Sequence, residues 1–204
     1  GRTQAAIERY DAAGAVHGHD TRDDARRALV ADWMADRSRD PAASQMLLAY
    51  TRADVAELNR LARETLRAAG NLGPDQAVET TSGERAFAVG DRVMFLRNER
   101  SLGVKNGTLG TLTALRRSGM EVRLDDGQTL RFDRNQYADL THGYAATIHK
   151  MQGATVDKAY VLASKHMDRH AAYVAMSRHR DATTLRYGRA EFATKIELGR
   201  RFGA

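Results

Sequence analysis

The stretch SQMLLAYTRADVAELNRLARETLRAAG, residues 44–70, joins a continuous apolar run directly to an amphipathic segment. The apolar run has the length of a buried strand, and Thr51 at its end is a residue type that caps helices. The apolar positions that follow recur at helical spacing and are Val55, Leu58, Leu61, Ala62 and Leu66. Gly70 is suited to end this helix. A buried strand followed at once by an amphipathic helix is the repeating unit of an α/β sheet.

The same alternation appears on both sides of this stretch. Residues 1–13 have a helical pattern that ends at Gly14, residues 15–19 form a candidate strand, and a helix follows with Asp20 or Thr21 as its cap. Near the other end, residues 158–164 and 183–188 have strand character, and residues 170–180 have helical character. We therefore expect an α/β fold with a parallel sheet flanked by helices.

The middle of the chain has a different pattern. From Glu84 to about Arg134, short segments of alternating polarity are separated by turn residues. These turn residues are Asn106-Gly107, Ser118-Gly119 and Asp125-Asp126-Gly127. Short strands joined by tight turns build a small β-barrel or a meander. We expect an α/β domain made of residues 1–84 and 137–204, interrupted by an inserted β-barrel at residues 85–136.

The composition suits a globular protein with a core. The 204 residues have a mean hydropathy of −0.55 and include no cysteine. No run of 18 apolar residues is present, so we expect no membrane insertion. The lack of cysteine excludes disulfides and thiolate-bound zinc, and it fits the location that we expect, a bacterial cytoplasm.

The charge is unevenly distributed along the chain. Residues 1–84 have a net charge of −3, whereas residues 85–204 have a net charge of +9, and most of the cations are arginines. A planar guanidinium suits phosphate oxygens, so the basic part predicts a polyanion partner, with nucleic acid favoured over membrane. The competing explanation is coding DNA of high G+C content, which produces arginine-rich proteins of any function.

The segment HGYAATIHKMQG, residues 142–153, places Thr147, His149, Lys150 and Gln152 within six residues and ends at Gly153. If this segment is a turn that leads into a helix, its polar groups meet at a helix N-terminus, which favours anions. The glycine would let the backbone approach a phosphate closely. A surface helix with a satisfied histidine is the alternative explanation.

The segment AYVAMSRHRDATTL, residues 172–185, is a second candidate site. Arg178 follows a run of small and apolar residues, so we expect it at the end of a largely buried helix. A guanidinium in such a place requires an anion to offset its desolvation. The anion is either an internal Asp or a nucleotide phosphate.

In this order, the two segments resemble motifs V and VI of superfamily 1 DNA helicases of the RecD-like group, especially TraA-type conjugative relaxase–helicases. Residues 144–162 are similar to motif V and residues 171–185 to motif VI. Residues 46–63 resemble the strand and helix that open the nucleic-acid surface of the second RecA-like domain. Residues 87–112 resemble the start of the Src-homology-3-like barrel that this group inserts. The resemblance covers nearly the whole chain and implies the second RecA-like domain of a longer helicase.

The resemblance implies a role for each matching residue. Arg178 would be the arginine finger that stabilises charge on the γ-phosphate of ATP. Gln152, Gly153 and Thr155 would lie on the ATP side of motif V. Many relatives have Glu at the position of Thr155, so a ribose contact would here fall to a shorter hydroxyl. The DNA-contacting residues would be Thr51, Arg52, Asn106, Thr147 and His149.

The chain has no sequence G-x-x-x-x-G-K-[ST], so it lacks the loop that cradles nucleotide phosphates. The resemblance implies that the full-length protein uses ATP and Mg²⁺, with the metal held by the first RecA-like domain, and that this chain alone does not hydrolyse ATP. The expected partners are single-stranded DNA, that first domain, and components of conjugation or type IV secretion. The pairs His17/His19 and His166/His170 lack a third ligand in the sequence, so we expect no metal site in this chain.

Two other functions fit the sequence. A nucleic-acid-binding module that acts through the basic barrel would keep its salt-sensitive DNA affinity without Arg178 and lose it without barrel arginines. A degenerate lobe that docks a conjugation or secretion partner would bind no DNA and would expose an apolar patch. The presence of Thr147, His149 and Arg178 favours the helicase lobe over the degenerate one.

Overall fold

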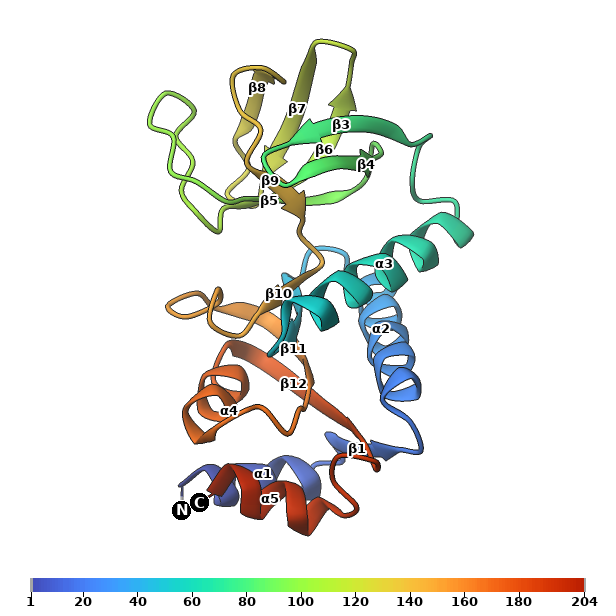
Figure 1. Cartoon of the computed structure of the whole chain (residues 1–204), viewed down its shortest axis with the longest axis vertical. Helices are drawn as coiled ribbons and strands as arrows, with labels where there is room; N and C mark the ends of the chain where they lie inside the picture. The colour runs from blue at the N-terminus through green and yellow to red at the C-terminus, as the bar shows by residue number, and fades with distance from the viewer. Residues whose placement is uncertain (1, 204) are drawn as a thin grey trace. The chain divides into compact units, whose positions relative to one another are not determined.

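The computed structural model describes residues 2–203, which divide into two compact units (Figure 1). The sheet unit contains the residues up to Ala62 and those from Ala145 onward. The insertion unit contains Arg63–Tyr144. The chain therefore leaves one unit, builds another, and returns to complete the first.

A five-stranded sheet forms the centre of the sheet unit. Its strands are β1 (Val16–His19), β2 (Gln45–Ala49), β10 (Ala145–Thr147), β11 (Val156–Leu162) and β12 (His179–Gly188). Their order is β1-β12-β11-β2-β10, and every neighbouring pair is parallel. The expected parallel sheet is confirmed. Because all strands run the same way, one edge of the sheet collects all their carboxyl ends and the opposite edge collects their amino ends.

Helices cover both faces of this sheet. They are α1 (Arg2–Ala12), α2 (Arg22–Arg39), α3 (Arg52–Ala68), α4 (Arg169–Met176) and α5 (Lys195–Gly203). Crossover connections between parallel strands are right-handed. The connections through α2 and α3 step across the sheet in one direction and that through α4 steps back, so α4 lies on the opposite face (Figure 1). α1 and α5 pack against each other and against α4.

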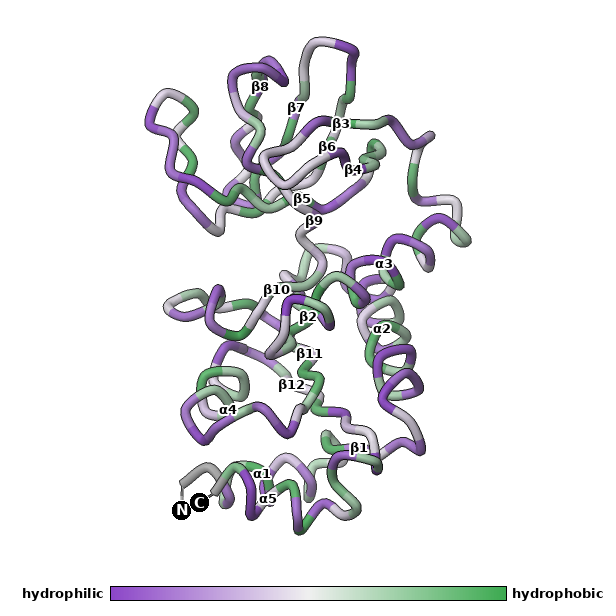
Figure 2. The backbone as a smooth tube through the Cα atoms, viewed as in Figure 1, coloured by the Kyte–Doolittle hydropathy of each residue, from purple (hydrophilic) through white to green (hydrophobic). Residues whose placement is uncertain are grey.

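Local sequence explains where the helices begin and which side they bury. The Thr21 hydroxyl accepts a hydrogen bond from the Asp24 N–H at 3.0 Å and caps α2. The buried side of α2 carries Ala25, Leu29 and Trp33, and hydrophobic and hydrophilic residues alternate along the helix (Figure 2). Gly70 follows α3 at a φ of 75°, a conformation that glycine adopts without a steric penalty.

The insertion unit is antiparallel. A hairpin of β3 (Gln76–Thr80) and β4 (Gly83–Phe87) accompanies a five-stranded sheet in the order β8-β7-β6-β5-β9. The strands of that sheet are β5 (Arg92–Phe95), β6 (Leu109–Leu115), β7 (Gly119–Leu124), β8 (Thr129–Asp133) and β9 (Leu140–His142). Val78 and Phe87 of the hairpin share one buried cluster with residues of the sheet. The expected inserted β structure is present, and residues 85–136 lie within this unit.

Two details differ from the sequence-based expectation. The helical segment expected at 170–180 ends at Met176, and β12 begins at His179. Residues 148–153 form turns and no helix, so the helix N-terminus considered for this segment is not formed, and the alternative of a surface helix is wrong as well. Thr147 lies beside Ala49 near the carboxyl ends of the strands, whereas Lys158 lies beside Gln45, so the chain must run back along the sheet in few residues. A helix advances only about 1.5 Å per residue, less than half of what extended chain covers, so a helix in these residues would not span that distance.

Within residues 2–203, no helix is long and apolar enough to cross a bilayer.

Candidate nucleic-acid and nucleotide sites

Four of the five residues expected to contact DNA meet at the carboxyl edge of the sheet. β2 and β10 are neighbours with Ala49 beside Thr147, and the Ile148 N–H donates to the Ala49 carbonyl oxygen at 2.9 Å. Thr51 and Arg52 follow β2, whereas His149 follows β10. Two segments almost 100 residues apart in the chain therefore present their polar ends side by side.

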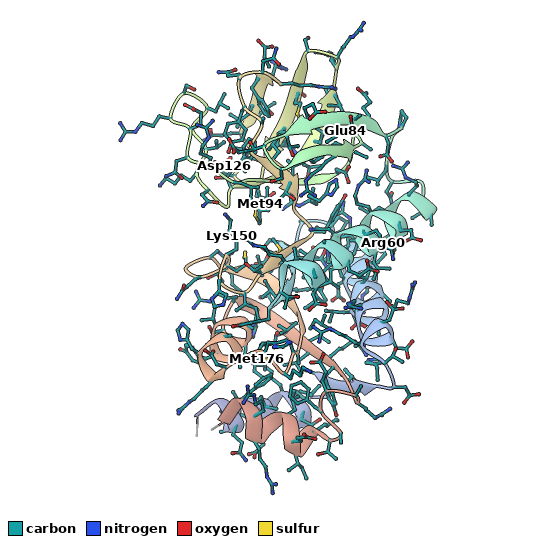
Figure 3. The ribbon with its side chains drawn as sticks, in the orientation of Figure 1. Arg60, Glu84, Met94, Asp126, Lys150 and Met176 are labelled. Atoms are coloured by element: carbon teal, nitrogen blue, oxygen red, sulfur yellow. The ribbon has the colours of Figure 1, made fainter. Side chains whose placement is uncertain are left out.

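The Thr147 hydroxyl is available to donate a hydrogen bond. Its oxygen accepts the Lys150 N–H at 3.2 Å, which holds the turn after β10. Lys150 is labelled in Figure 3. Among the residues that the structure describes, none accepts the Thr147 hydroxyl proton. This side chain is half-buried and can donate to an external acceptor such as a phosphate oxygen.

The Thr51 hydroxyl is used inside the protein. It donates to the Asp54 carboxylate at 2.8 Å, and its oxygen accepts the Asp54 N–H at 3.2 Å, which caps α3. Its only proton is therefore not available to a DNA phosphate. The neighbouring Arg52 is exposed at the first position of α3.

Tyr50 lies next to these residues and was not among the sequence-predicted contacts. Its ring makes an edge-to-face contact with His149, with 5.5 Å between ring centroids. His149 is exposed and Tyr50 is half-buried. The position of Tyr50 between β2 and the helix cap is the only sequence feature that indicated its place at this edge.

A buried carboxylate connects several segments at the same edge of the sheet. Asp54, only 3% exposed, accepts hydrogen bonds from Arg22, from Arg26 at 2.8 Å and from Thr51. Burial alone would raise the pKa of Asp54, but these three hydrogen bonds together lower it below its ordinary value of 3.8. Arg22 also pairs with Glu191, which follows β12. This network ties together the segments that follow β1, β2 and β12.

Arg178 lies at the opposite, amino edge of the sheet. Its backbone carbonyl oxygen accepts the N–H of Val156, the first residue of β11, at 3.0 Å. Its guanidinium donates to the carbonyl oxygens of Val174 at 3.3 Å and Ala154 at 3.5 Å. Within the described part of the chain, no carboxylate pairs with it. Of the two anions considered for Arg178, the internal Asp is not observed, and the half-exposed guanidinium retains capacity for an external anion.

The other residues expected near ATP divide into two groups. Gly153 and Thr155 are exposed. They flank Ala154, whose carbonyl oxygen accepts from Arg178, so they lie beside the Arg178 guanidinium. Gly153 has a φ of 86°, which a residue with a Cβ rarely adopts. The Gln152 side chain lies elsewhere, with its amide nitrogen 3.5 Å from Nε2 of His170 in the first turn of α4.

Asn106 belongs to the insertion unit. It is exposed, and its N–H donates to the Asn98 side-chain oxygen at 2.8 Å. Gly107 after it has a φ of 96°, as a tight turn requires.

The structure describes no group of three or more His, Asp or Glu side chains that could hold a metal within residues 2–203. His19 belongs to one of the two histidine pairs considered for a metal, and its Nε2 lies 2.8 Å from an Arg186 guanidinium nitrogen.

This chain is similar in sequence to several known proteins. A family model described as the viral superfamily 1 RNA helicase core domain matches residues 95–187. The conjugal transfer protein TraA of Agrobacterium fabrum is 41% identical over 196 residues, which are 95% of this chain and 18% of that protein. This chain thus spans less than a fifth of the length of that relative.

Solved structures of Bacteroides Pif1 share the fold. Pif1 bound to ssDNA is 27% identical, with a TM-score of 0.57 over 75% of this chain and 42% of that one. Pif1 helicase in complex with ADP-AlF3 and ssDNA is 26% identical, with a TM-score of 0.54 over 78% of this chain and 45% of that one. By sequence and by fold, this chain is a superfamily 1 helicase domain that is homologous to the TraA conjugal transfer proteins and shares the fold of the Pif1 helicases.

Proposed function

We propose that this chain is the second RecA-like motor domain of an ATP-dependent, RecD-like DNA helicase within a conjugative relaxase. In the full-length protein it contributes an arginine finger to ATP hydrolysis and one wall of a single-stranded DNA track. The observation that carries this proposal is the presence of two different groups that can donate hydrogen bonds to an anion, at opposite edges of one sheet. Within residues 2–203, these groups are the Thr147 hydroxyl, whose proton has no acceptor, and the Arg178 guanidinium, which has no carboxylate partner.

The carboxyl edge is proposed to bind the DNA backbone. Thr147 would donate its hydroxyl proton to a phosphate oxygen, while Arg52 would supply positive charge beside it. The exposed His149 ring, held against Tyr50, would lie along the same strand of DNA. Thr51 would contribute by capping α3 and fixing this edge, because its hydroxyl proton is used by Asp54.

The amino edge is proposed to face ATP bound between the two RecA-like domains. The half-exposed Arg178 guanidinium fits an anionic phosphate, because its present partners are two backbone carbonyl oxygens at 3.3 and 3.5 Å. ATP with Mg²⁺ would supply the phosphoryl group that is transferred to water. Arg178 would stabilise the negative charge that develops on that group. The metal ligands and the phosphate cradle would come from the first RecA-like domain.

The test is binding of a fluorescent single strand of about 20 nucleotides, followed by anisotropy at several salt concentrations. Thr147→Val removes the hydroxyl at nearly constant size, whereas Thr147→Ser keeps it. We expect affinity that falls with salt, a loss of about tenfold or more in Thr147→Val, and little change in Thr147→Ser.

Equal affinity of Thr147→Val and the unchanged chain would contradict a DNA track at this edge. If Asn106→Ala instead reduced the affinity, binding would belong to the insertion unit. Absence of binding at low salt would favour a lobe that docks a conjugation or secretion partner.

A further inference from the structure

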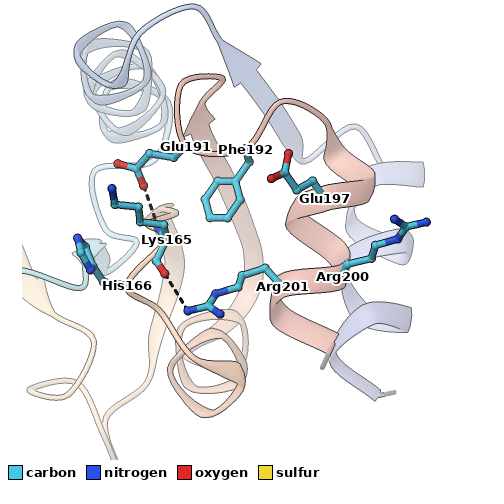
Figure 4. Close-up of a pocket in the computed structure, with 7 residues that line it drawn as sticks. All are labelled: Lys165, His166, Glu191, Phe192, Glu197, Arg200 and Arg201. Carbon is cyan, nitrogen blue, oxygen red and sulfur yellow. Dashed lines mark hydrogen bonds between the residues drawn. The ribbon is translucent and has the colours of Figure 1, made fainter.

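A cavity of about 610 Å³ lies where β11 and β12 end, beside α5 (Figure 4). Lys165 and His166 line it from the segment after β11, and Glu191 and Phe192 line it from the segment after β12. The remaining lining residues are Glu197, Arg200 and Arg201 of α5. None of them was among the residues expected to contact DNA or ATP.

The two carboxylates of this cavity are already used by the protein. Glu191 pairs with Arg22 through one oxygen and accepts the Lys165 N–H at 2.8 Å through the other. Glu197 accepts the Ala193 N–H at 2.8 Å, in the reciprocal cap of α5 that Thr194 completes. The charge of Glu191 is therefore offset by Arg22, whereas Glu197 keeps its negative charge with one oxygen engaged by the Ala193 N–H.

The cations of the cavity have spare capacity. Within the described residues, no carboxylate pairs with Lys165, Arg200 or Arg201. Arg201 makes one hydrogen bond, from a terminal nitrogen to the Lys165 carbonyl oxygen at 3.1 Å, and it extends toward Lys165 in Figure 4. Lys165, His166 and Arg201 are all exposed. The cavity thus presents positive charge that is not used internally.

The position of the cavity connects it with the proposed DNA track. β10, β2, β11 and β12 are consecutive neighbours in the sheet, and neighbouring strands lie about 4.8 Å apart. The segments after β11 and β12 are therefore one and two strand spacings from the Thr51 segment along the same carboxyl edge. A strand of a few nucleotides is long enough to reach from one to the other.

We infer that Lys165, His166 and Arg201 form a phosphate-binding pocket that continues the single-stranded DNA track across the carboxyl ends of β11 and β12. This inference rests on the proposed function. The pocket takes the backbone phosphates of the strand, because Lys165 and Arg201 present cationic donors that suit phosphate oxygens.

The experiment compares two lengths of single-stranded DNA. An oligonucleotide of about 3 nucleotides is too short to contact the Thr147 edge and the pocket at the same time, whereas one of about 16 spans both. Lys165→Ala/Arg201→Ala removes two pocket cations. The matched control Arg27→Ala/Arg39→Ala removes two exposed arginines from α2 of the same unit. A third variant, Lys165→Glu, leaves the Arg201 side chain in place and guards against a folding defect.

We expect the two pocket variants to bind the short oligonucleotide normally and to lose about tenfold in affinity for the long one. The salt slope for the long oligonucleotide should fall by about 1 to 1.5, since each single-strand phosphate contact contributes about 0.7. The control variant should keep the full increase in affinity from the short to the long oligonucleotide.

If both pocket variants still bound the long oligonucleotide more tightly than the short one, to the same extent as the unchanged chain, the pocket would be overturned. Binding of the short oligonucleotide to Thr147→Val would still test the track by itself. Loss of short-oligonucleotide binding in the unchanged chain would remove the proposed function and this inference with it. Poly-glutamate serves as an acidic-peptide probe. If it bound the pocket and the long DNA did not, the site would belong to an acidic protein partner.

Discussion

At the scale of single residues, Thr51 and Thr147 lie at the ends of neighbouring strands and have opposite hydrogen-bonding situations. The Thr51 proton goes to Asp54 at 2.8 Å, whereas the Thr147 proton has no acceptor within the described residues. Thr51→Val should therefore lower the free energy of unfolding by about 1 kcal/mol, because α3 loses its cap. It should change DNA affinity far less than Thr147→Val does. Urea denaturation and anisotropy titration on the same two proteins measure both effects.

Thr51→Ser is the control for this comparison, since it keeps the capping oxygen and the proton. A Thr51→Val protein of unchanged stability that lost DNA affinity as strongly as Thr147→Val would show that the Thr51 hydroxyl reaches DNA after all.

At the scale of secondary-structure elements, Asp54 connects the first turn of α3 to the first turn of α2 through Arg22 and Arg26. Asp54→Asn should lower the free energy of unfolding by about 2 kcal/mol, because it removes the buried carboxylate that Arg22 and Arg26 share. Arg22 keeps its pair with Glu191, and Arg26 keeps a longer pair with Asp23 at 3.9 Å. Since the pKa of Asp54 is lowered in the folded state, its contribution is present above about pH 3.8 and is lost as pH falls through the folded-state pKa. The stability difference between the two proteins should therefore shrink below about pH 3.8, as urea denaturation at several pH values measures.

Asp23→Asn is the matched control, because Asp23 pairs with Arg27 at 2.8 Å on the exposed side of α2 and should matter little. Equal losses in the two variants would mean that the Asp54 network does not fasten the helices.

At the scale of the whole molecule, the two proposed sites lie at opposite edges of one parallel sheet. In the longer helicase that we propose, Arg178→Ala should reduce DNA-stimulated ATP hydrolysis by about 10³-fold, since an arginine finger supplies an effect of that size. Single-stranded DNA binding by this chain should remain unchanged in that variant, because the residues proposed to contact DNA lie at the carboxyl ends of β2 and β10, at the opposite edge of the sheet from Arg178. A coupled phosphate-release assay and the anisotropy titration measure these two quantities.

Arg180→Ala is the control for Arg178, since Arg180 is two residues further along the chain and has Asp157 as a partner at 3.5 Å. An equal loss of hydrolysis in both variants would show that general charge at this edge, rather than the Arg178 guanidinium, supports the reaction.

The sequence by itself determined the elements whose cause is local. Thr51 and Thr21 cap helices through their own neighbours, Gly70 and Gly107 adopt positive φ, and the buried run at 45–49 forms a strand. The parallel α/β class followed from the repeated order of strand and helix. The resemblance at motifs V and VI correctly indicated the superfamily 1 helicases. These features depend on residues within a few positions of each other, so they can be deduced without knowing the pairing of distant strands.

Only the tertiary structure decided how distant segments meet. The pairing of β10 with β2 placed Thr147 beside Ala49, and the pairing of β11 with β2 made residues 148–153 a turn and not the helix considered for them. The same packing left Arg178 without a carboxylate partner among the described residues and assembled the cavity at Lys165 and Arg201. The physical reason is that hydrogen-bond partners and charge neutralisation are set by strand order and register, and these depend on contacts between residues that are tens of positions to more than 150 positions apart.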